Sequence, residues 1–185
     1  MELRDAINGR RATRNFLQTA VTRAAITSLI DAAVQAPNAM NGQPWHFTAI
    51  RNASLLADIA ATAKAHALKM TANNQHVIQL HDVLILNDYD IFYHAPALVI
   101  ISVRSGAWAV EDGALAAENL MLAAHEAGLG SCWIGFAQAW LATREGRGAI
   151  GLPEEYTPVA PIIIGYPATP APAISRKLPR IAWFE

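Results

Sequence analysis

The sequence predicts a single domain of mixed α and β structure, and three observations lead to this prediction. The chain has 185 residues, of which 53% are apolar, which is enough for one substantial core. Several segments carry apolar residues at helical spacing. Between them lie short continuous apolar runs, such as residues 97–103 (ALVIISV), which are typical of strands buried on both faces. We therefore expect residues 1–185 to form one domain, with residues 166–185 as an extended C-terminal arm.

Composition narrows the class of protein. Charged residues make up only 16% of the chain and the net charge is −1, which argues against a nucleic-acid binder. So apolar a chain of this length is expected to need a partner that covers part of its surface. The single cysteine, Cys132, excludes an internal disulfide and favours a reducing compartment. We find no signal-peptide pattern and no run of about eighteen apolar residues, so we expect a cytoplasmic protein without a membrane span.

The central stretch, residues 109–136, is expected to form the framework of the domain. Its polar residues fall in two heptad-spaced columns that make one narrow stripe on a helix otherwise rich in Ala, Leu and Met. The columns are Glu111, Glu118 and His125, and Asp112, Asn119 and Glu126. Gly128 suits the left-handed cap that ends such a helix. Ser131–Ile134 then reads as a short buried strand closed by Gly135, which leaves backbone exposed at its end.

The other elements follow from periodicity and from their boundary residues. Thr22 is a suitable N-cap for the second helix and Pro37 ends it. Asn73-Asn74 is expected to break a long helical region. We predict helices over residues 3–9, 24–36, 54–86 and 137–147, strands over residues 46–50, 97–103 and 159–165, and an ordered loop with special backbone angles over residues 37–45.

Two segments carry groups suited to binding a cofactor. Arg10, Arg11 and Arg14 form a dense cationic cluster, which is either a solvated basic turn or a clamp for phosphate oxygens. The loop at residues 37–45 is either a plain connection or a recognition loop for the edge of a heteroaromatic ring. Its three amides offer both donors and acceptors, and they are Asn38, Asn41 and Gln43.

Other kinds of site have weaker support. His66, His76 and His81 do not share one helical face, so we expect no metal site there. Cys132 is better explained as a small buried hydrophobe than as a nucleophile. A dinucleotide-binding fold is disfavoured because no GxGxxG motif occurs.

Four motifs, in order along nearly the whole chain, resemble those of the FMN-dependent nitroreductase family. Residues 10–16 (RRATRNF) resemble its RRSxRxF opening, and residues 36–45 (APNAMNGQPW) resemble its APSxxNxQPW loop. Residues 119–135 are similar to its NLxLAA…GLGxxWIG segment. Residues 165–167 (GYP) and Arg176-Lys177 match its GYP…RK tail. Two serines of the family are replaced here, by Ala12 and Asn38.

The resemblance implies an α+β fold with a mixed sheet flanked by helices. It implies an obligate homodimer whose C-terminal arms wrap around the partner subunit, with two FMN sites at the interface. Arginines of residues 10–14, together with Arg176 or Lys177, would hold the phosphate and the pyrimidine end of the ring. Asn38, Ala39 and Asn41 would reach the flavin of the other subunit. Ile134 and Gly135 would lie along the ring with a backbone N–H near N5. The full set of expected FMN contacts is Arg10, Arg11, Ala12, Arg14, Pro37, Asn38, Ala39, Asn41, Gln43, Cys132, Trp133, Ile134, Gly135, Arg176 and Lys177.

The activity implied by the resemblance is an FMN-dependent NAD(P)H oxidoreductase. NADH or NADPH would give a hydride to N5, and a nitroaromatic, a quinone or a related conjugated acceptor would then replace the nicotinamide. Such chemistry needs no acid, base or nucleophile from the protein, in keeping with the absence of such an arrangement in the sequence. The alternatives are a flavin-binding or redox-sensing protein with little turnover, and a specialised relative that destroys flavin or dehalogenates reductively.

The mid-chain contacts and the substrate side remain more open. Asn73 and Asn74 are the candidates for a mid-chain flavin contact. The region from Lys69 to His81 and the segment Phe92-Tyr93-His94 are expected to wall the substrate pocket. For His94, a proton donor and a packing or capping residue are the alternative roles.

Overall fold

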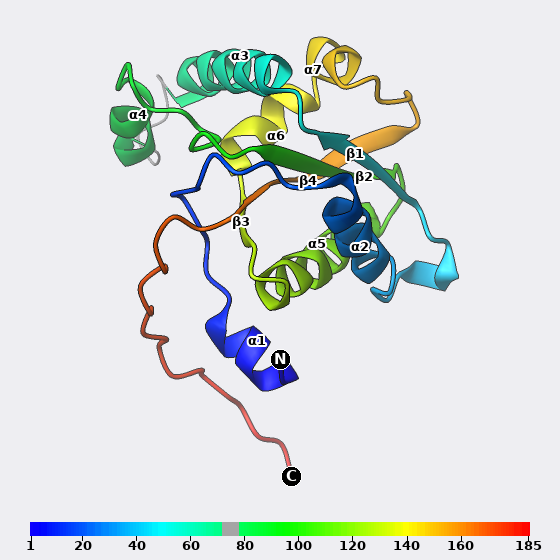
Figure 1. Ribbon diagram of the computed structural model, residues 1–185. Helices are drawn as coiled ribbons and strands as arrows, with labels where there is room; N and C mark the ends of the chain where they lie inside the picture. Colours follow the sequence, from blue (N-terminus) through cyan, green and yellow to red (C-terminus); the bar gives the residue numbers. More distant parts are fainter. Residues whose placement is uncertain (72–77) are drawn as a thin grey trace.

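The computed structural model of the chain describes residues 1–71 and 78–185 and has a four-stranded sheet between two layers of helices (Figure 1). The strands are β1 (Trp45–Ile50), β2 (Ala97–Arg104), β3 (Gly130–Trp133) and β4 (Tyr156–Gly165). The helices are α1 (Leu3–Gly9), α2 (Arg23–Ala33), α3 (Ala53–Thr71), α4 (Ile78–Leu84), α5 (Ala109–Glu126), α6 (Gly135–Leu141) and α7 (Arg144–Ala149), with a 3-10 turn, η1 (Ala39–Asn41).

The sheet has the strand order β1-β2-β4-β3, and each neighbouring pair is antiparallel. The expectation of a mixed sheet is therefore wrong for the described part of the chain, where the four strands form an antiparallel sheet. Parallel pairing occurs there only at an isolated bridge between Ala12 and Ser131. Apolar runs identify buried strands, but they carry no information about strand direction, which depends on the connections between strands.

Strand β2 separates two apolar layers, as its continuous apolar run predicts. Leu98 and Ile100 face a cluster that includes residues of α3 and α6. Val99 and Ile101 face a cluster that includes residues of α2 and α5. Side chains alternate between the two faces of a strand, so a strand covered by helices on both sides needs apolar residues throughout.

Helix α5 packs closely on the sheet at a glycine. A Cβ at Gly113 would lie 2.8 Å from Val159 Cγ1 and 3.0 Å from Val103 Cγ2, so the missing side chain permits the close approach. The helix ends as predicted, because Gly128 has a φ of 73°. The following strand, β3, begins at Gly130 and is buried over its first three residues.

Two predicted helices have different boundaries. Thr22 caps α2 by accepting a hydrogen bond from Ala25 N at 3.1 Å, but the helix ends at Ala33 instead of Ala36. The prediction of one continuous helix over residues 137–147 is wrong, because two helices, α6 and α7, meet at Thr143. The Thr143 hydroxyl donates to Trp140 O and accepts from Gly146 N, so it closes α6 and caps α7. The predicted break at Asn73-Asn74 lies outside the described residues.

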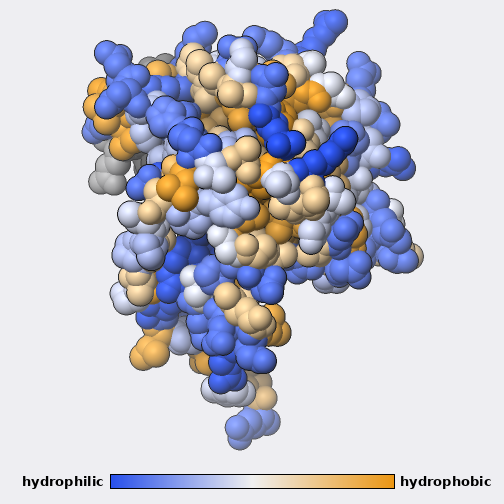
Figure 2. All heavy atoms as spheres, in the orientation of Figure 1, coloured by the Kyte–Doolittle hydropathy of each residue, from blue (hydrophilic) through white to orange (hydrophobic). Residues whose placement is uncertain are grey.

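The C-terminal segment leaves the body of the molecule without forming a helix or strand from residue 168 to residue 185 (Figure 1). Figure 2 shows the same projection as spheres, with polar and apolar residues mixed along it. Its last aromatic residues are exposed, Trp183 by 79% and Phe184 by 95%. In the part of the chain that the structure describes, no helix combines the length and apolarity needed to cross a membrane.

Candidate functional site

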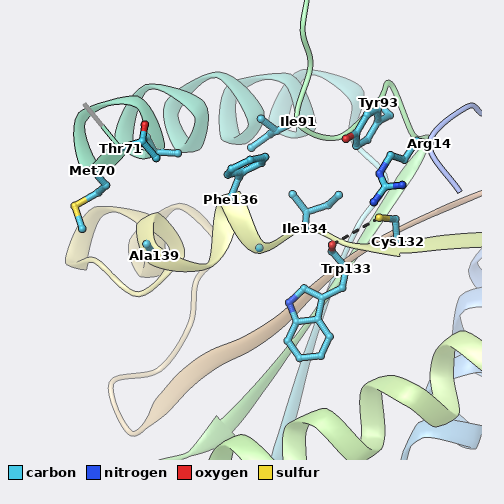
Figure 3. A pocket seen from close by; sticks show the side chains of 12 residues that line it. Arg14, Met70, Thr71, Ile91, Tyr93, Cys132, Trp133, Ile134, Phe136 and Ala139 are labelled. Carbon is cyan, nitrogen blue, oxygen red and sulfur yellow. Dashed lines mark hydrogen bonds between the residues drawn. The ribbon is translucent and has the colours of Figure 1, made fainter. Parts of the chain in front are cut away.

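An apolar cavity of about 460 Å³ lies between α3, α6 and the end of β3 (Figure 3). Aliphatic and aromatic side chains form most of its wall, and Arg14 contributes a positive charge at one end. The lining residues are Arg14, Ala67, Met70, Thr71, Ile91, Tyr93, Cys132, Trp133, Ile134, Gly135, Phe136 and Ala139. Five of the residues predicted from the sequence therefore meet in one place: Arg14, Cys132, Trp133, Ile134 and Gly135.

The arginine segment, residues 10–16, reaches this cavity because it runs alongside β3. Thr13 N donates a hydrogen bond to Ser131 O at 2.9 Å, next to the bridge between Ala12 and Ser131. The Thr13 side chain is only 6% exposed and fills the space above Gly130. Farther along, Phe16 pairs with Pro167. The segment therefore behaves like an additional strand at the edge of the sheet, and it directs Arg14 to the cavity.

Arg10 and Arg11 do not line the cavity. Arg11 Nη1 donates to Asn8 O at 2.6 Å and to Arg10 O at 2.8 Å, while its buried Nε has no partner. Arg10 Nε lies 3.3 Å from Glu118 Oε1, an ion pair without hydrogen-bond geometry. Both guanidinium groups thus keep donor capacity, which a phosphate could use.

The end of β3 presents open backbone to the cavity. Ile134 N donates to Pro161 O at 2.8 Å, so this N–H is already paired. Gly135 begins α6, and a first-turn N–H has no acceptor within its own helix. A Cβ at Gly135 would meet no atom within 4 Å, so a flat molecule has room to approach. A backbone donor, a guanidinium and apolar walls together fit a planar heteroaromatic ring such as a flavin.

Trp133 contributes less than expected. Its backbone is at the cavity, but its indole points away from Arg14 and Phe136 (Figure 3). The ring packs against the apolar layer that includes residues of α2 and α5. Alternation along β3 explains this, because Cys132 and Trp133 face opposite sides of the sheet.

Burial raises the pKa values of two side chains near the cavity, Cys132 and Tyr89. Burial raises the pKa of the Cys132 thiol, and the nearby Arg14 and Arg10 lower it in part. Burial also raises the pKa of Tyr89 well above its usual range, with a further contribution from its hydrogen bond to Tyr93. Both groups are therefore neutral at physiological pH, which supports the prediction that Cys132 is a buried hydrophobe.

These shifts predict that the free energy of unfolding falls as the pH rises above about 9. The folded state holds the Cys132 and Tyr89 protons more tightly than the unfolded state, so unfolding releases protons in this range and the slope of stability with pH is negative. Below about pH 8 neither group makes the free energy of unfolding depend on pH, since both are protonated in the folded and the unfolded state. Urea unfolding at a series of pH values measures the slope. Cys132→Ala and Tyr89→Phe should each make it shallower, and unchanged slopes in both variants would contradict the assignment.

The amide loop, residues 37–45, does not line the apolar cavity of its own chain. Met40, Asn41 and Gln43 have φ values of 55°, 52° and 46°, which confirms the predicted special backbone angles. Asn38 Oδ1 accepts a hydrogen bond from Gln43 N at 2.8 Å and so closes the loop. Ala39 and Gln43 line a second, more polar cavity of about 370 Å³.

Asp112 supports this loop, and sequence reasoning missed its role. Its carboxylate accepts a hydrogen bond from Ala39 N at 2.9 Å, and its carbonyl accepts one from Trp45 Nε1 at 3.3 Å. It is only 6% exposed, although the sequence places it in the polar stripe of α5. A carboxylate directly before Gly113, a glycine at which α5 packs closely on the sheet, was the available signal.

Arg176 and Lys177 are not brought to either cavity. They lie in the exposed C-terminal segment, so a single chain does not combine them with Arg14.

The predicted cavity wall is only partly right. Met70 and Thr71 at the end of α3 and Tyr93 line the cavity as expected. Phe92 does not, because it is fully buried in the core. His94 is exposed, its Nδ1 lies 3.1 Å from Asp90 Oδ2, and its backbone N donates to the same carboxylate oxygen. The structure therefore favours a capping role for His94.

Of the four cavity residues that were not predicted, Ala67 and Ile91 come from α3 and the segment before β2, and Phe136 and Ala139 come from α6. The spacing of Phe136 and Ala139 after Gly135 places them on one face of α6, a signal that is readable only once the start of this helix is known.

No metal centre occurs among the described residues, since no group of three His, Cys, Asp or Glu side chains could hold an ion there. The nitrogen Nδ1 of His81 lies 3.0 Å from Thr71 Oγ1, and His76 lies outside the described residues.

Comparison with known proteins gives consistent matches. Residues 7–166 match the model of the Nitroreductase family. A crystal structure of a nitroreductase with bound FMN from Bacteroides fragilis is 29% identical, with a TM-score of 0.85 over 100% of both chains. Oxidized iodotyrosine deiodinase, bound to FMN and 3-iodo-L-tyrosine, is 24% identical with a TM-score of 0.82 over 100% of both chains, which shows a shared fold.

A shorter match is to a protein described as a putative NADH dehydrogenase/NAD(P)H nitroreductase from Methanothermobacter thermautotrophicus. It is 36% identical over 59 residues. The alignment spans 32% of this chain and 31% of that protein, or about a third of the length of the curated relative.

Proposed function

Because the chain belongs to the nitroreductase family, we propose that it is an FMN-dependent oxidoreductase that uses NADH or NADPH to reduce nitroaromatics, quinones or related conjugated acceptors. The observation that carries the proposal is the apolar cavity that has Arg14 at one end and open backbone at Gly135. The 29% identical nitroreductase of Bacteroides fragilis, whose structure contains FMN, supports the choice of cofactor.

The residues around the cavity have separable roles in this proposal. Arg14 would place a positive charge near the pyrimidine edge of the ring, where it stabilises negative charge. The Gly135 N–H would donate toward N5, and the side chains of Ile134 and Phe136 would exclude water from the ring. When bound, FMN supplies the hydride chemistry at N5, so no nucleophile or general base is required of the chain.

Arg10 and Arg11 are the proposed phosphate ligands. The buried Nε of Arg11 has no partner, and the Nε of Arg10 has only an ion pair of poor geometry. Ala12 lacks a hydroxyl, so the guanidinium groups would carry the phosphate contact without help from a serine at this position.

We propose that the protein works as a homodimer with FMN at the subunit interface. Two observations support this. The amide loop at residues 37–45 does not line the apolar cavity of its own chain, so it is free to complete the site of a partner. The C-terminal segment carries Leu178, Trp183 and Phe184, all strongly exposed, and a second subunit would bury them.

The first test is an absorption spectrum of the purified protein, with mass spectrometry of what heat releases. We expect flavin bands near about 370 and 450 nm and released FMN. NAD(P)H oxidation with a nitroaromatic and with a quinone then separates an enzyme from a flavin-binding or redox-sensing protein, which would show no turnover with either acceptor. A colourless protein that also fails to take up added FMN would contradict the proposal.

A further inference from the structure

We infer that Tyr93 hydrogen-bonds the pyrimidine edge of the bound flavin and that Tyr89 positions its hydroxyl, an inference that rests on the proposed function. Tyr93 lines the apolar cavity beside Arg14, whose guanidinium carbon lies 5.9 Å from the centroid of the Tyr93 ring. Figure 3 shows the two side chains together at one end of the cavity, with Phe136 and Met70 toward the other. The cavity thus has a polar end and an apolar end.

Among the polar side chains on the described cavity wall, Tyr93 and Arg14 differ from the others. The Thr71 hydroxyl donates to Ala67 O at 3.0 Å and meets the His81 ring. The Cys132 thiol is 3.6 Å from Trp133 O, and the indole of Trp133 points out of the cavity (Figure 3). Within the described wall, the groups that keep capacity for a ligand are therefore the Arg14 guanidinium and the Tyr93 hydroxyl.

The backbone that carries Tyr93 is held in an unfavourable conformation. Tyr93 and His94 have φ values of 52° and 54°, a region that non-glycine residues rarely adopt. Asp90 holds this turn: its carboxylate accepts hydrogen bonds from Phe92 N at 2.8 Å and from His94 N at 2.9 Å. Its backbone O accepts from Tyr93 N at 3.0 Å. Two successive residues with strained backbone, fixed by one carboxylate, are typical of a site where a side chain is held in one direction for a function.

Tyr89 fixes the position of the Tyr93 hydroxyl. The two hydroxyl oxygens are 2.8 Å apart, and the rings pack edge to face with centroids 5.6 Å apart. Lys64 Nζ donates to Tyr89 O at 2.8 Å and holds the backbone of this residue. Burial raises the pKa of Tyr89, so it keeps its proton and can donate it to the Tyr93 oxygen. The Tyr93 proton is then available for an acceptor in the cavity.

The chemistry of the ligand edge follows from this arrangement. A guanidinium and a hydroxyl donor side by side select carbonyl oxygens or a developing negative charge, which the pyrimidine edge of a flavin offers. Tyr93 would therefore bind the reduced, more negative cofactor more tightly than the oxidised one. Tyr89 does not line this cavity, so it acts only through Tyr93.

The test compares Tyr93→Phe, Tyr89→Phe and wild type in FMN titrations of the flavin-free protein, followed by quenching of flavin fluorescence. We expect Tyr93→Phe to weaken binding of oxidised FMN by about 3- to 10-fold, the usual value of one hydrogen bond. Binding of reduced FMN should weaken more, which shifts the midpoint potential to more negative values. Tyr89→Phe should give smaller changes in the same direction. Tyr166→Phe is the matched control, because Tyr166 lines neither cavity described above.

The outcomes separate this inference from the proposed function. If wild type does not bind FMN at all, the proposed function fails and the inference fails with it. If wild type binds FMN, and Tyr93→Phe matches both wild type and Tyr166→Phe in affinity and midpoint potential, only the role of Tyr93 is overturned. Circular dichroism of each variant verifies that the fold is kept, and a Tyr93→Phe variant that retains its thermal unfolding midpoint but loses affinity supports a direct contact.

Discussion

Replacing Arg14 with alanine should weaken FMN binding by about 10- to 100-fold and leave the fold intact. Arg14 is exposed, yet its side chain is the cation that lines the apolar cavity in the described chain. A charge-assisted hydrogen bond in such surroundings contributes about 1.5–3 kcal/mol, which corresponds to this range of affinity. Fluorescence titration of the flavin-free protein measures the change. The thermal unfolding midpoint without FMN should stay within about 4 °C of wild type, since the contact of this exposed arginine with the Tyr93 ring contributes only about 0.5–1 kcal/mol.

Two further variants make the Arg14 result specific. Arg14→Lys keeps the charge but loses the planar guanidinium, so it should recover only part of the affinity. Arg51→Ala removes an exposed arginine between β1 and α3 that lines neither cavity, and it should bind FMN like wild type. Equal losses in Arg14→Ala and Arg51→Ala would mean that net charge, and not the cavity contact, controls binding.

The sequence predicted most of the elements because their signals are local. The cap at Thr22, the end of the central helix at Gly128 and the apolar run of β2 each depend on a few neighbouring residues, and all three are present. The failed helix over residues 137–147 contains a cap at Thr143, which apolar periodicity alone does not reveal. Strand direction was also beyond reach, because it is set by packing between distant segments.

In the candidate site, residues of contiguous motifs were likewise predicted, and residues brought together by tertiary packing were missed. Arg14 and Gly135 belong to motifs of contiguous residues, and both meet at the cavity. Ala67 and Phe136 come from separate segments and share the cavity only because α3 and α6 pack against each other. Asp112 reads as a polar residue on a helix surface, and its burial depends on a loop 73 residues away in the sequence. Such partners are set by tertiary contacts that no local pattern records.

Gly130→Ala should impair FMN binding indirectly and also destabilise the fold. A Cβ at Gly130 would lie 2.5 Å from Thr13 Oγ1 and 2.7 Å from Thr13 Cβ, so the arginine segment would have to move away from β3. Thr13 is buried, and its backbone N–H donates a hydrogen bond to Ser131 O, so the Thr13 side chain has little room to move. Overpacking of this kind typically costs about 1–3 kcal/mol. Because Arg14 follows Thr13 directly, we expect both a lower urea midpoint and an FMN affinity reduced at least about 5-fold, as for loss of one hydrogen bond.

A double-mutant cycle tests whether the two effects share this cause. Thr13→Gly removes the side chain that the new methyl group would strike, so Gly130→Ala should cost less in the Thr13→Gly background than in wild type, with a coupling of about 1 kcal/mol or more. Gly148→Ala is the matched control: a Cβ there meets no atom within 4 Å, and within α7 the change should be neutral or stabilising by up to about 1 kcal/mol. Additive effects of the Thr13 and Gly130 substitutions would show that the arginine segment is not anchored through this contact. Strong coupling in stability together with recovered FMN affinity would instead establish that the packing of Thr13 on Gly130 is what delivers Arg14 to the cavity.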